Sequence, residues 1–357
     1  MLIAFSTKAQ VNFQWAKGMG GTFPEEGRSV IVDGSGNVYT TGHFEGTVDF
    51  DPNGGVFNLT STGYRDIFIS KLDASGNFIW AKNIGATNLN YGFSILTDVG
   101  GNVYTTGFFD GTADFDPGIG VFNLISTGGL DSFISKLDAN GNFIWAKSWG
   151  ADVSFSIAFD AIGNIYTTGY FQGTADFDPG AGVFNLTAIG IYDVSISKLD
   201  AIGNFIWAKS MGGPSSANAG NSITIDASGN VYTTGSFENT VDFNPGAGVF
   251  NLTAVGSYDI FIHKMSQSPL EIKGLAFDST LMEVFPNPNN GMFKLILKDK
   301  IENVEIVLIN SLGQEVHRQP IIQGANEVIT TGLAKGLYNY ITLQDKQKIK
   351  CDKLIIE

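Results

Sequence analysis

Apolar and polar residues alternate in short runs over the first 265 residues, a pattern that predicts β-strands rather than helices. In the first unit, strands are expected at 29–33 and 37–42, and again at 66–73 and 77–82. The turn inside each pair follows the pattern Asp-x-x-Gly-Asn, in which Asp favours the start of a type I turn and Gly supplies a left-handed residue. Each unit is therefore predicted to contain two β-hairpins.

This hairpin pattern occurs four times. A Trp-Ala-Lys triplet recurs at spacings of 65, 65 and 62 residues, beginning at Trp15, Trp80, Trp145 and Trp207. Inside each unit, 12 residues separate the Asn after the first turn from a DFDP-like run, and 17 more lead to the Asp before the next strand. Every change of length falls between a Trp-Ala-Lys triplet and the next hairpin, which predicts a surface loop there and a fixed scaffold elsewhere.

The strand interiors are apolar on both faces, so both faces of each sheet must be covered. Four-stranded sheets stacked around an axis meet this requirement. We therefore predict an all-β fold in which 10–265 form a β-propeller of four blades, each a repeat of about 65 residues. A lone fourth strand at 13–17 and a last unit that ends after its third strand, at 259–264, are expected to pair and close the ring. An open array and a fragment of a larger ring are the alternatives.

One stretch of the repeat has a family likeness. The run Gly-Asn-Val-Tyr-Thr-Thr-Gly, followed by Asp-x-Phe-Ile-Ser-Lys-Leu-Asp-x-x-Gly-Asn, resembles the SBBP β-propeller repeats of secreted bacterial proteins. The chain departs from those repeats in the excursion that contains the DFDP-like run. The resemblance therefore implies a propeller repeat but does not fix the number of blades or the size of the ring.

The composition changes after the fourth unit. A polar linker is predicted at 266–280, and from residue 281 short alternating strands are separated by Gly313, Gly324 and Gly336. Many short strands in about 75 residues indicate a small immunoglobulin-like β-sandwich over 281–357.

The same segment carries motifs in a fixed order: Phe-Pro-Asn-Pro, Ile-x-Asn-x-x-Gly-Gln-x-Val, Gly-Leu-Tyr and a terminal Lys-Leu-Ile-Ile. It resembles the C-terminal sorting domain, or Por secretion tail, of type IX secretion system substrates in Bacteroidota. The positions that carry this resemblance are Pro286, Asn287, Pro288, Gly291, Gly313, Gly336, Tyr338 and Lys353. The resemblance implies handling by the type IX secretion machinery and a secreted or outer-membrane surface location in a Gram-negative bacterium. It leaves open whether the tail is removed and whether the protein is anchored or released.

The first nine residues are interpreted as the remnant of a secretory signal peptide. An apolar stretch at 2–5 is followed by small and polar residues before Gln10, although a basic start is missing. An ordinary short N-terminal arm is the alternative.

Charge and cysteine content narrow the function classes. The net charge is -14, and nearly all of it lies in 1–268, where 24 acidic residues face 11 basic ones. Such a surface repels a phosphate backbone, so we expect no nucleic-acid partner. The sequence has no apolar run of the roughly 18 residues that a transmembrane segment needs. A single cysteine, Cys351, can form no disulfide within the chain.

The sequence shows no catalytic constellation. The three histidines do not recur with the repeat, and neither a Gly-x-Ser-x-Gly elbow nor a phosphate-binding glycine loop occurs. We therefore predict a non-enzymatic secreted or cell-surface module for binding or adhesion. The alternative is a secreted glycan-active enzyme whose paired carboxylates come from different blades.

The DFDP-like runs allow two interpretations. Two aspartates at i and i+2 point to one side of a strand and are oxygen ligands suited to calcium. However, calcium needs six to eight oxygens, and the fourth run replaces its second aspartate with Asn244. We favour a tight turn closed by Pro and Gly, with no cofactor. In the calcium interpretation the ligands are Asp49, Asp51, Asp114, Asp116, Asp176, Asp178 and Asp242.

The loops of variable length are where a ligand site is expected, because the identical positions serve the shared fold. These loops carry Phe23, Tyr91 and Trp149 among glycines and polar residues. Aromatic rings on rigidly held loops suit contact with an extracellular glycan or protein. Packing of the same rings between blades is the alternative.

Overall fold

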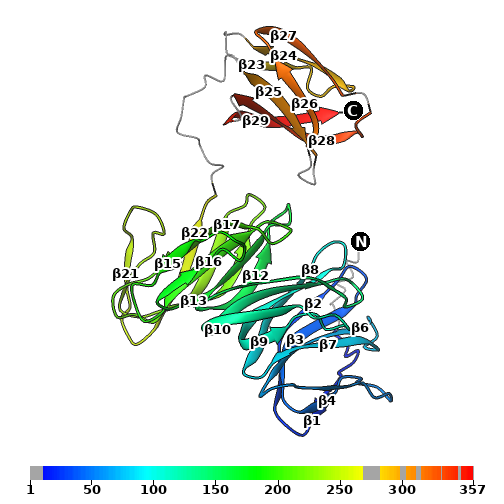
Figure 1. The fold of residues 1–357 in the computed structure, drawn as a ribbon, viewed down its shortest axis with the longest axis vertical. Coiled ribbons are helices and arrows are strands. Elements are labelled where there is room, and N and C mark those ends of the chain that lie inside the picture. Colours follow the sequence, from blue (N-terminus) through cyan, green and yellow to red (C-terminus); the bar gives the residue numbers. More distant parts are fainter. Residues whose placement is uncertain are drawn as a thin grey trace, which may run out of the picture. The chain divides into compact units, whose positions relative to one another are not determined.

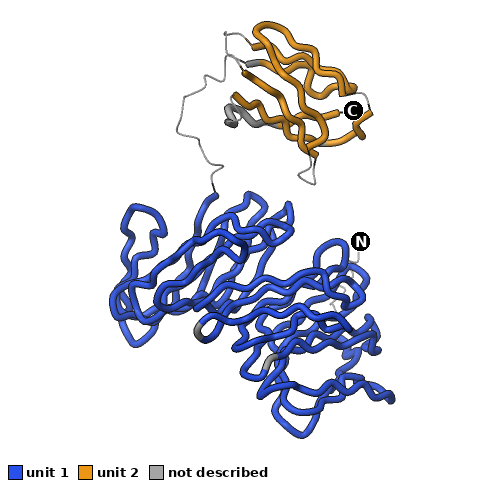
Figure 2. Tube along the Cα trace, in the orientation of Figure 1, with its two compact units in different colours: residues 1–267 blue, residues 268–357 orange. Residues whose placement is uncertain are grey.

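The structure, a computed structural model, describes residues 11–267, 282–297, 303–310, 315–330, 332–344 and 347–356. The chain divides into two compact units, 1–267 and 268–357 (Figure 2). The described residues of both units form β-strands and no helix, which confirms the all-β class. The predicted signal remnant at 1–9 and nearly all of the predicted linker at 266–280 lie outside these residues.

In unit 1, the main strands of each repeat form an antiparallel sheet in chain order (Figure 1). Repeat 1 contains β2 (Glu25–Val32), β3 (Val38–Phe44), β6 (Asp66–Leu72) and β7 (Phe78–Ala86). Repeat 2 contains β8 (Asn90–Thr97), β9 (Val103–Asp114), β10 (Asn123–Leu137) and β11 (Phe143–Trp149). Repeat 3 contains β12 (Asp152–Phe159), β13 (Ile165–Phe171), β16 (Asp193–Leu199) and β17 (Phe205–Met211). Repeat 4 contains β18 (Ala219–Ile225), β19 (Val231–Phe237) and β22 (Asp259–Met265).

The excursion in the middle of each repeat forms a small hairpin of its own. These hairpins are β4 (Thr47–Asp49) with β5 (Asn58–Thr60), the end of β9 with the start of β10, β14 (Thr174–Asp176) with β15 (Asn185–Thr187), and β20 (Thr240–Asp242) with β21 (Asn251–Thr253). Two of these hairpins also pair with a segment that precedes their repeat. β1 (Gly20–Gly21) pairs with β4, and the end of β7 pairs with the end of β9. In repeats 1 and 2, the hairpin thus ties its repeat to the strand that precedes the repeat.

The core lies between neighbouring sheets. Ile67 and Ile69 of repeat 1 share one cluster with Ile95 and Phe109 of repeat 2, and all four are at most 2% exposed. Because strands of one sheet are covered on one face by the next repeat, their residues are apolar on both faces, as the sequence pattern required.

The predicted closure of the ring is absent. In the described residues β22 pairs with β19 alone, and residues 11–19 form no strand. The indole Nε1 of Trp15 instead donates to the carbonyl of Ala74 at 3.2 Å, which anchors this segment to repeat 1. Figure 1 shows β2 and β22 at opposite ends of unit 1. The described repeats therefore form an open array.

Unit 2 is a pair of sheets. One contains β23 (Met282–Phe285), β24 (Met292–Leu297) and β27 (Gly324–Ile329); the other contains β26 (Glu315–Ile321), β25 (Val304–Ile309), β28 (Gly336–Gln344) and β29 (Gln347–Ile356). Phe293 and Val328 of the first sheet share a core with Ile306 and Tyr340 of the second. Two sheets around one apolar core are the arrangement of a β-sandwich.

Candidate functional site between the repeats

Each Asp-x-x-Gly-Asn turn is held by the carboxylate of its own aspartate. Asp33 Oδ1 accepts hydrogen bonds from the backbone N–H groups of Ser35 and Asn37, both at 2.9 Å. Asp33 Oδ2 accepts from Asn37 Nδ2 at 2.8 Å, and Gly36 has a φ of 83°. Burial raises the pKa of Asp33, but the hydrogen bonds from Asn37 and its neighbours outweigh this effect and hold the pKa below its usual value. The carboxylate therefore stays charged and fixes the turn.

A tyrosine and a lysine stand beside the aspartate of each first turn. The Tyr39 hydroxyl donates to Asp33 Oδ2 at 3.1 Å, and Lys71 Nζ lies 4.9 Å from the centre of the Tyr39 ring, a cation–π contact. Burial, with the added effect of Asp33, raises the pKa of Tyr39, so its hydroxyl remains a donor. The same trio recurs as Asp98, Tyr104 and Lys136, as Asp160, Tyr166 and Lys198, and as Asp226, Tyr232 and Lys264.

Between repeats 1 and 2, a cavity of about 610 Å³ opens beside this trio. The first turns of the two repeats form facing walls, and Asp33 and Asp98 are half-buried in them. The lining consists of 32–35, Asn37, Tyr39 and Lys71 from repeat 1, and 97–101 and Ala139 from repeat 2. The cavity therefore combines two carboxylates, a buried cation and turn backbone.

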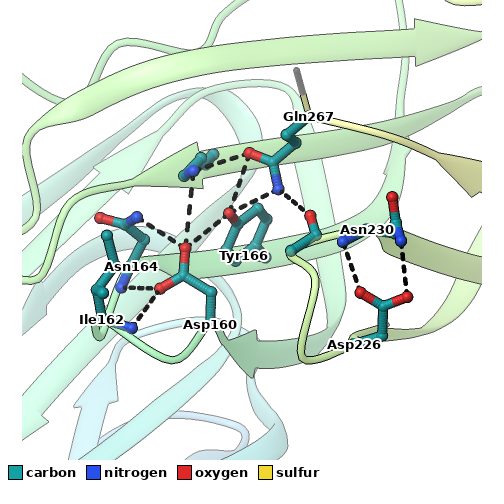
Figure 3. A network of polar contacts seen from close by, with 9 residues as sticks. Asp160, Ile162, Asn164, Tyr166, Asp226, Asn230 and Gln267 are labelled. Carbon is teal, nitrogen blue, oxygen red and sulfur yellow. Dashed lines mark hydrogen bonds and ion pairs between the residues drawn. The ribbon is translucent and has the colours of Figure 1, made fainter. Parts of the chain in front are cut away.

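Between repeats 3 and 4, the corresponding place is filled by the side chain of Gln267, as Figure 3 shows. Gln267 Oε1 accepts from Lys198 Nζ at 2.8 Å and lies 3.1 Å from the Tyr166 oxygen, whose hydrogen goes to Asp160 Oδ2 at 2.9 Å. Gln267 Nε2 lies 2.8 Å from the Tyr166 oxygen and donates to the carbonyl of Gly229 at 2.8 Å. All polar atoms of this carboxamide are thus bound by the repeat residues around them.

Ala139 and Gln267 occupy equivalent positions. Each lies eight residues after the equivalent aspartate of its repeat, Asp131 in β10 or Asp259 in β22. Lys71 Nζ donates to the backbone carbonyl of Ala139 at 3.0 Å, where Lys198 Nζ donates to the Gln267 side chain. The methyl group of Ala139 leaves open the volume that the longer Gln267 side chain fills at the other junction.

The junction between repeats 2 and 3 contains a fully buried carboxylate. Asp152 accepts hydrogen bonds from Ser195 Oγ at 2.8 Å, Trp149 Nε1 at 2.8 Å, Ser132 Oγ at 2.9 Å and Ser154 Oγ at 3.3 Å. Burial raises the pKa of Asp152 to about 6, although these hydrogen bonds act in the opposite direction. The four donors come from both repeats, so Asp152 joins them through polar contacts rather than forming a site open to ligand.

The three aromatic residues expected to contact ligand lie in different surroundings. Phe23 is 51% exposed on its loop. Tyr91 is half-buried, with its ring centre 4.1 Å from that of His43 and 5.0 Å from that of Phe108. Trp149 is 3% exposed and bonded to Asp152, so the prediction is wrong for Trp149, which packs between repeats. The structure does not bring these rings together at the cavity.

The DFDP-like runs are built as capped turns. Asp114 Oδ1 accepts from the backbone N–H of Asp116 at 3.0 Å and of Phe122 at 2.8 Å, and Asp116 Oδ1 accepts from Gly118 N–H at 2.8 Å. In the fourth run, Asn244 Oδ1 accepts from Gly246 N–H at 2.9 Å, so the side-chain amide makes the same hydrogen bond as the carboxylate.

The same hydrogen-bonding pattern holds Asp49 with Asp51, Asp176 with Asp178, and Asp242 with Asn244. The phenylalanine inside each run is at most 5% exposed, and these residues are Phe50, Phe115, Phe177 and Phe243. Over the described ranges, no group of three or more His, Cys, Asp or Glu residues is placed to hold a metal ion. The side-chain oxygens and the ring thus account for the run as a structural element.

Sequence reasoning missed the Asp–Tyr–Lys trio because it searched for a ligand site where the repeats differ. The signal was present: the three residue types recur at the same positions in all four units, although a shared fold explains most such positions. Gln267 could have been found by extending the repeat alignment two residues past Met265.

The sorting-motif residues of unit 2 that are described cluster around the last strand. Asn287, between Pro286 and Pro288, donates from Nδ2 to the carbonyl of Lys353 at 2.8 Å, and its Oδ1 accepts from the N–H of Ile355 at 2.9 Å. Gly291 N–H donates to Asn289 Oδ1 at 2.9 Å.

The remaining motif residues lie at or near β28. Gly336 begins this strand, and Tyr338, 7% exposed, donates its hydroxyl hydrogen to the carbonyl of Ala334 at 2.7 Å. Gly313 lies outside the described residues. Through the hydrogen bonds of Asn287, the Pro-Asn-Pro motif thus joins the start of the domain to its C-terminal strand, β29.

Residues 283–357 match the family model of the secretion system C-terminal sorting domain. The protein is accordingly an all-β repeat protein that carries the sorting signal of the type IX secretion system, and its place is the cell surface or the extracellular space of a Bacteroidota. Over the described ranges, no helix is both long enough and apolar enough to span a membrane.

Unit 1 has more distant similarities. An uncharacterized WD repeat-containing protein of Acanthamoeba polyphaga mimivirus is 28% identical over 246 residues, which are 59% of this chain and 17% of that protein. Regulatory protein FlaEY of Caulobacter vibrioides is 26% identical over 164 residues, 43% of this chain and 17% of that protein. The chain thus spans about a sixth of the length of these curated relatives.

Among solved structures, PorZ, a surface component of the type IX secretion system of Porphyromonas gingivalis, is 10% identical with a TM-score of 0.25. The match covers 93% of this chain and 45% of PorZ.

Proposed function

We propose that the protein is a non-enzymatic binding module of the cell surface or extracellular space, and that it takes its ligand in the cavity between repeats 1 and 2. The observation that carries this proposal is the equivalent place between repeats 3 and 4, where the same trio binds a carboxamide of the chain itself. A scaffold that satisfies every polar atom of Gln267 presents the same residue types around an open cavity of about 610 Å³ at its other end.

The chemistry of the cavity favours a neutral ligand that carries an amide. At the occupied junction, a lysine donates to the amide oxygen, and a tyrosine hydroxyl oxygen and a glycine carbonyl accept from the amide nitrogen. The first junction lines its cavity with the equivalent residues Lys71, Tyr39 and Gly101. Extracellular proteins with exposed Asn or Gln side chains and glycans with acetamido groups both offer this chemistry. The two half-buried aspartates disfavour anionic ligands.

The sheet architecture supports the propeller-type description of unit 1. Three repeats place four antiparallel strands side by side in chain order, which is the arrangement of a propeller blade, as in the SBBP-type repeats that the sequence resembles. Such repeats hold loops and turns in fixed positions, and this suits recognition more than it suits chemistry.

Ligand binding is tested by screening the full chain against immobilised glycans and extracellular peptides rich in Asn and Gln. Ala139→Gln should fill the cavity and lower the affinity of any ligand found by at least 10-fold, because it reproduces the occupied junction. Ala201→Gln, at the equivalent position of repeat 3, is the matched control and should leave binding unchanged. Equal binding by both variants would place the ligand elsewhere.

Turnover of bound glycans is measured in the same screen. Product release that a single Asp→Asn substitution abolishes would contradict the non-enzymatic role and favour a glycan-active enzyme.

Export by the sorting domain is tested in the native host. Deletion of 281–357 should leave unit 1 in the periplasm, where added protease does not reach it. Unchanged display at the surface would contradict the role of this domain in sorting.

A further inference from the structure

The last repeat exposes a face that every other repeat buries. Ile260 and Ile262 of β22 are 83% and 80% exposed. Their counterparts in β6, Ile67 and Ile69, are 0% and 1% exposed because repeat 2 covers them. The counterparts in β16, Val194 and Ile196, are both 0% exposed. Repeat 4 thus carries an apolar contact face, here called the tail face (Ile260 and Ile262), without a cover.

The first repeat exposes the complementary face. Val30 and Val32 of β2 are 64% and 55% exposed. The residues equivalent to Val30 in the next three repeats, Ile95, Ile157 and Ile223, are 2%, 4% and 5% exposed, since the preceding repeat covers each of them. Val30 and Val32 form the head face.

Next to the head face lies a strand sequence without a sheet. Residues 12–17, Asn-Phe-Gln-Trp-Ala-Lys, match the fourth strand of repeats 1 to 3 at every position except Gln14, where those strands have isoleucine. They nevertheless form no strand, and Phe13 is 81% exposed. Trp15 Nε1 donates to the Ala74 carbonyl at 3.2 Å, just as Trp80 Nε1 donates to the Ala139 carbonyl at 3.2 Å. Trp15 therefore sits on repeat 1 as Trp80 sits on repeat 2.

At the internal junction, the strand that carries Trp80 performs two tasks at once. It pairs with β6 of its own repeat, with Trp80 opposite Lys71, and it docks its indole on the following repeat. Segment 12–17 performs only the second task, and β22 has an edge that pairs with nothing in the described residues. An unpaired edge beside an apolar face is a surface built for strand addition.

We infer that the tail face of one molecule binds the head face of a second copy, whose segment 12–17 adds to β22 as its missing fourth strand. The register follows from the internal repeats: Trp15 of the second copy lies opposite Lys264, and its Lys17 lies opposite Ile262, as Trp80 and Lys82 lie opposite Lys71 and Ile69. The joint between copies continues the interface that already joins repeats 1 and 2.

A second copy is the occupant that the observations favour. The head and tail faces of one chain lie at opposite ends of unit 1 (Figure 1), so a chain cannot cover its own tail face in this arrangement. The two faces differ from each other, so the contact is head-to-tail and closes into a ring or extends into a longer assembly. This inference does not depend on the ligand of the cavity.

The test is the mass of the full chain in solution, measured by sedimentation velocity over a wide range of concentration. Species at multiples of 38.2 kDa that grow with concentration are expected. Ile262→Asp on the tail face and Val30→Asp on the head face should each raise the dissociation constant by roughly 10- to 100-fold, because each puts a carboxylate into an apolar contact. Ile162→Asp is the control: Ile162 is 74% exposed in a turn, away from both faces, and this variant should associate like the unchanged chain.

Mixing the two variants identifies the kind of contact. Ile262→Asp retains an intact head and Val30→Asp an intact tail. At a concentration where each variant alone is monomeric, an equimolar mixture should therefore form a one-to-one pair and nothing larger. A pair that forms in either variant alone would show a head-to-head or tail-to-tail contact and overturn the inference.

Hydrogen exchange of the backbone amides tests whether β22 gains a strand when the chain associates. The amides of β22 that point away from β19, toward the unpaired edge, should be protected only at concentrations at which the chain associates. A chain that stays monomeric at every concentration overturns the inference; protection of those amides in the monomer would identify its own first repeat or its sorting domain as the cover.

Discussion

The junction between repeats 1 and 2 and the junction between repeats 3 and 4 are built from the same trio at the same positions, and one of the places where they differ is the residue beside the trio. Ala139 leaves a cavity at the first, whereas Gln267 fills the corresponding volume at the last. The comparison shows that a repeat scaffold can present the same polar groups at several junctions, and that a side chain of the chain itself can occupy one of these places.

The largest expected effect comes from the tryptophan that spans a junction. Trp80 is 8% exposed and bonded to the carbonyl of Ala139, so Trp80→Ala should lower the free energy of unfolding by about 3 to 5 kcal/mol. Trp207, its equivalent in repeat 3, is only half-buried, and Trp207→Ala should cost about half as much. Urea denaturation measures both. Equal losses would mean that the two junctions are held alike.

The junction between repeats 2 and 3 differs from the other two in that its stability is expected to depend on pH. The pKa of Asp152, about 6 in the folded protein, lies above the usual aspartate value of about 3.9. The folded state therefore binds the extra proton, and the stability this provides is complete below pH about 4 and is lost as the pH rises through about 6. The change is on the order of 3 kcal/mol.

Asp152→Asn should remove this dependence, because an amide does not ionise, and Asn90 already fills the equivalent position in repeat 2. Thermal or urea unfolding at pH 4 and pH 7 measures the difference between the two proteins. An unchanged pH profile in Asp152→Asn would assign the dependence to other groups.

A smaller effect is expected where Gln267 fills the last junction. Gln267→Ala removes the acceptor for Lys198 and the donor to the Tyr166 oxygen and should cost about 1 to 2 kcal/mol. It should also open a cavity like the first. Acetamide at high concentration is expected to restore part of the lost melting temperature by binding there, with sodium acetate as the charged control. Equal recovery with both solutes would speak against a carboxamide site.

The smallest effect is expected at the turns that both ends share. Asp116→Asn should change the free energy of unfolding by less than about 0.5 kcal/mol, because Asn244 already makes the equivalent hydrogen bond. Asp116→Ala should cost about 1 kcal/mol, since the N–H of Gly118 loses its partner. Calcium should leave the melting temperature unchanged in all three proteins. A calcium-dependent rise that Asp116→Asn abolishes would revive the metal interpretation.

The sequence predicted the local structure well because the turns carry their own chemistry. The Asp-x-x-Gly-Asn pattern fixed each hairpin through hydrogen bonds within five residues, and the constant distances fixed the order of strands in each sheet. The sorting domain was found from motifs whose residues bond directly to one another, such as Asn287 and Lys353.

The features that sequence could not supply depend on contacts between repeats. Closure of the ring depends on the angle between successive sheets, and the residue pattern does not determine this angle. Trp15 was predicted to lie in a strand paired with repeat 4, but its indole bonds to repeat 1. From its place in a loop of variable length, Trp149 was predicted to be exposed, but in the structure its indole bonds to Asp152. The cavity arises from Ala139 and two turns, which lie in different repeats.

The small excursion hairpins have a mechanical consequence. Gly85 pairs with Asp114 across the first junction, and Gly212 pairs with Asp242 across the third, so these junctions carry backbone hydrogen bonds in addition to side-chain contacts. At the second junction, where the loop is shortest, the hydrogen bonds of Asp152 with its four donors make a larger part of the contact between the repeats. A surface protein is pulled by flowing liquid and by whatever it holds. Under such a force we expect the array to part first between repeats 2 and 3, and to do so more readily at neutral than at acidic pH.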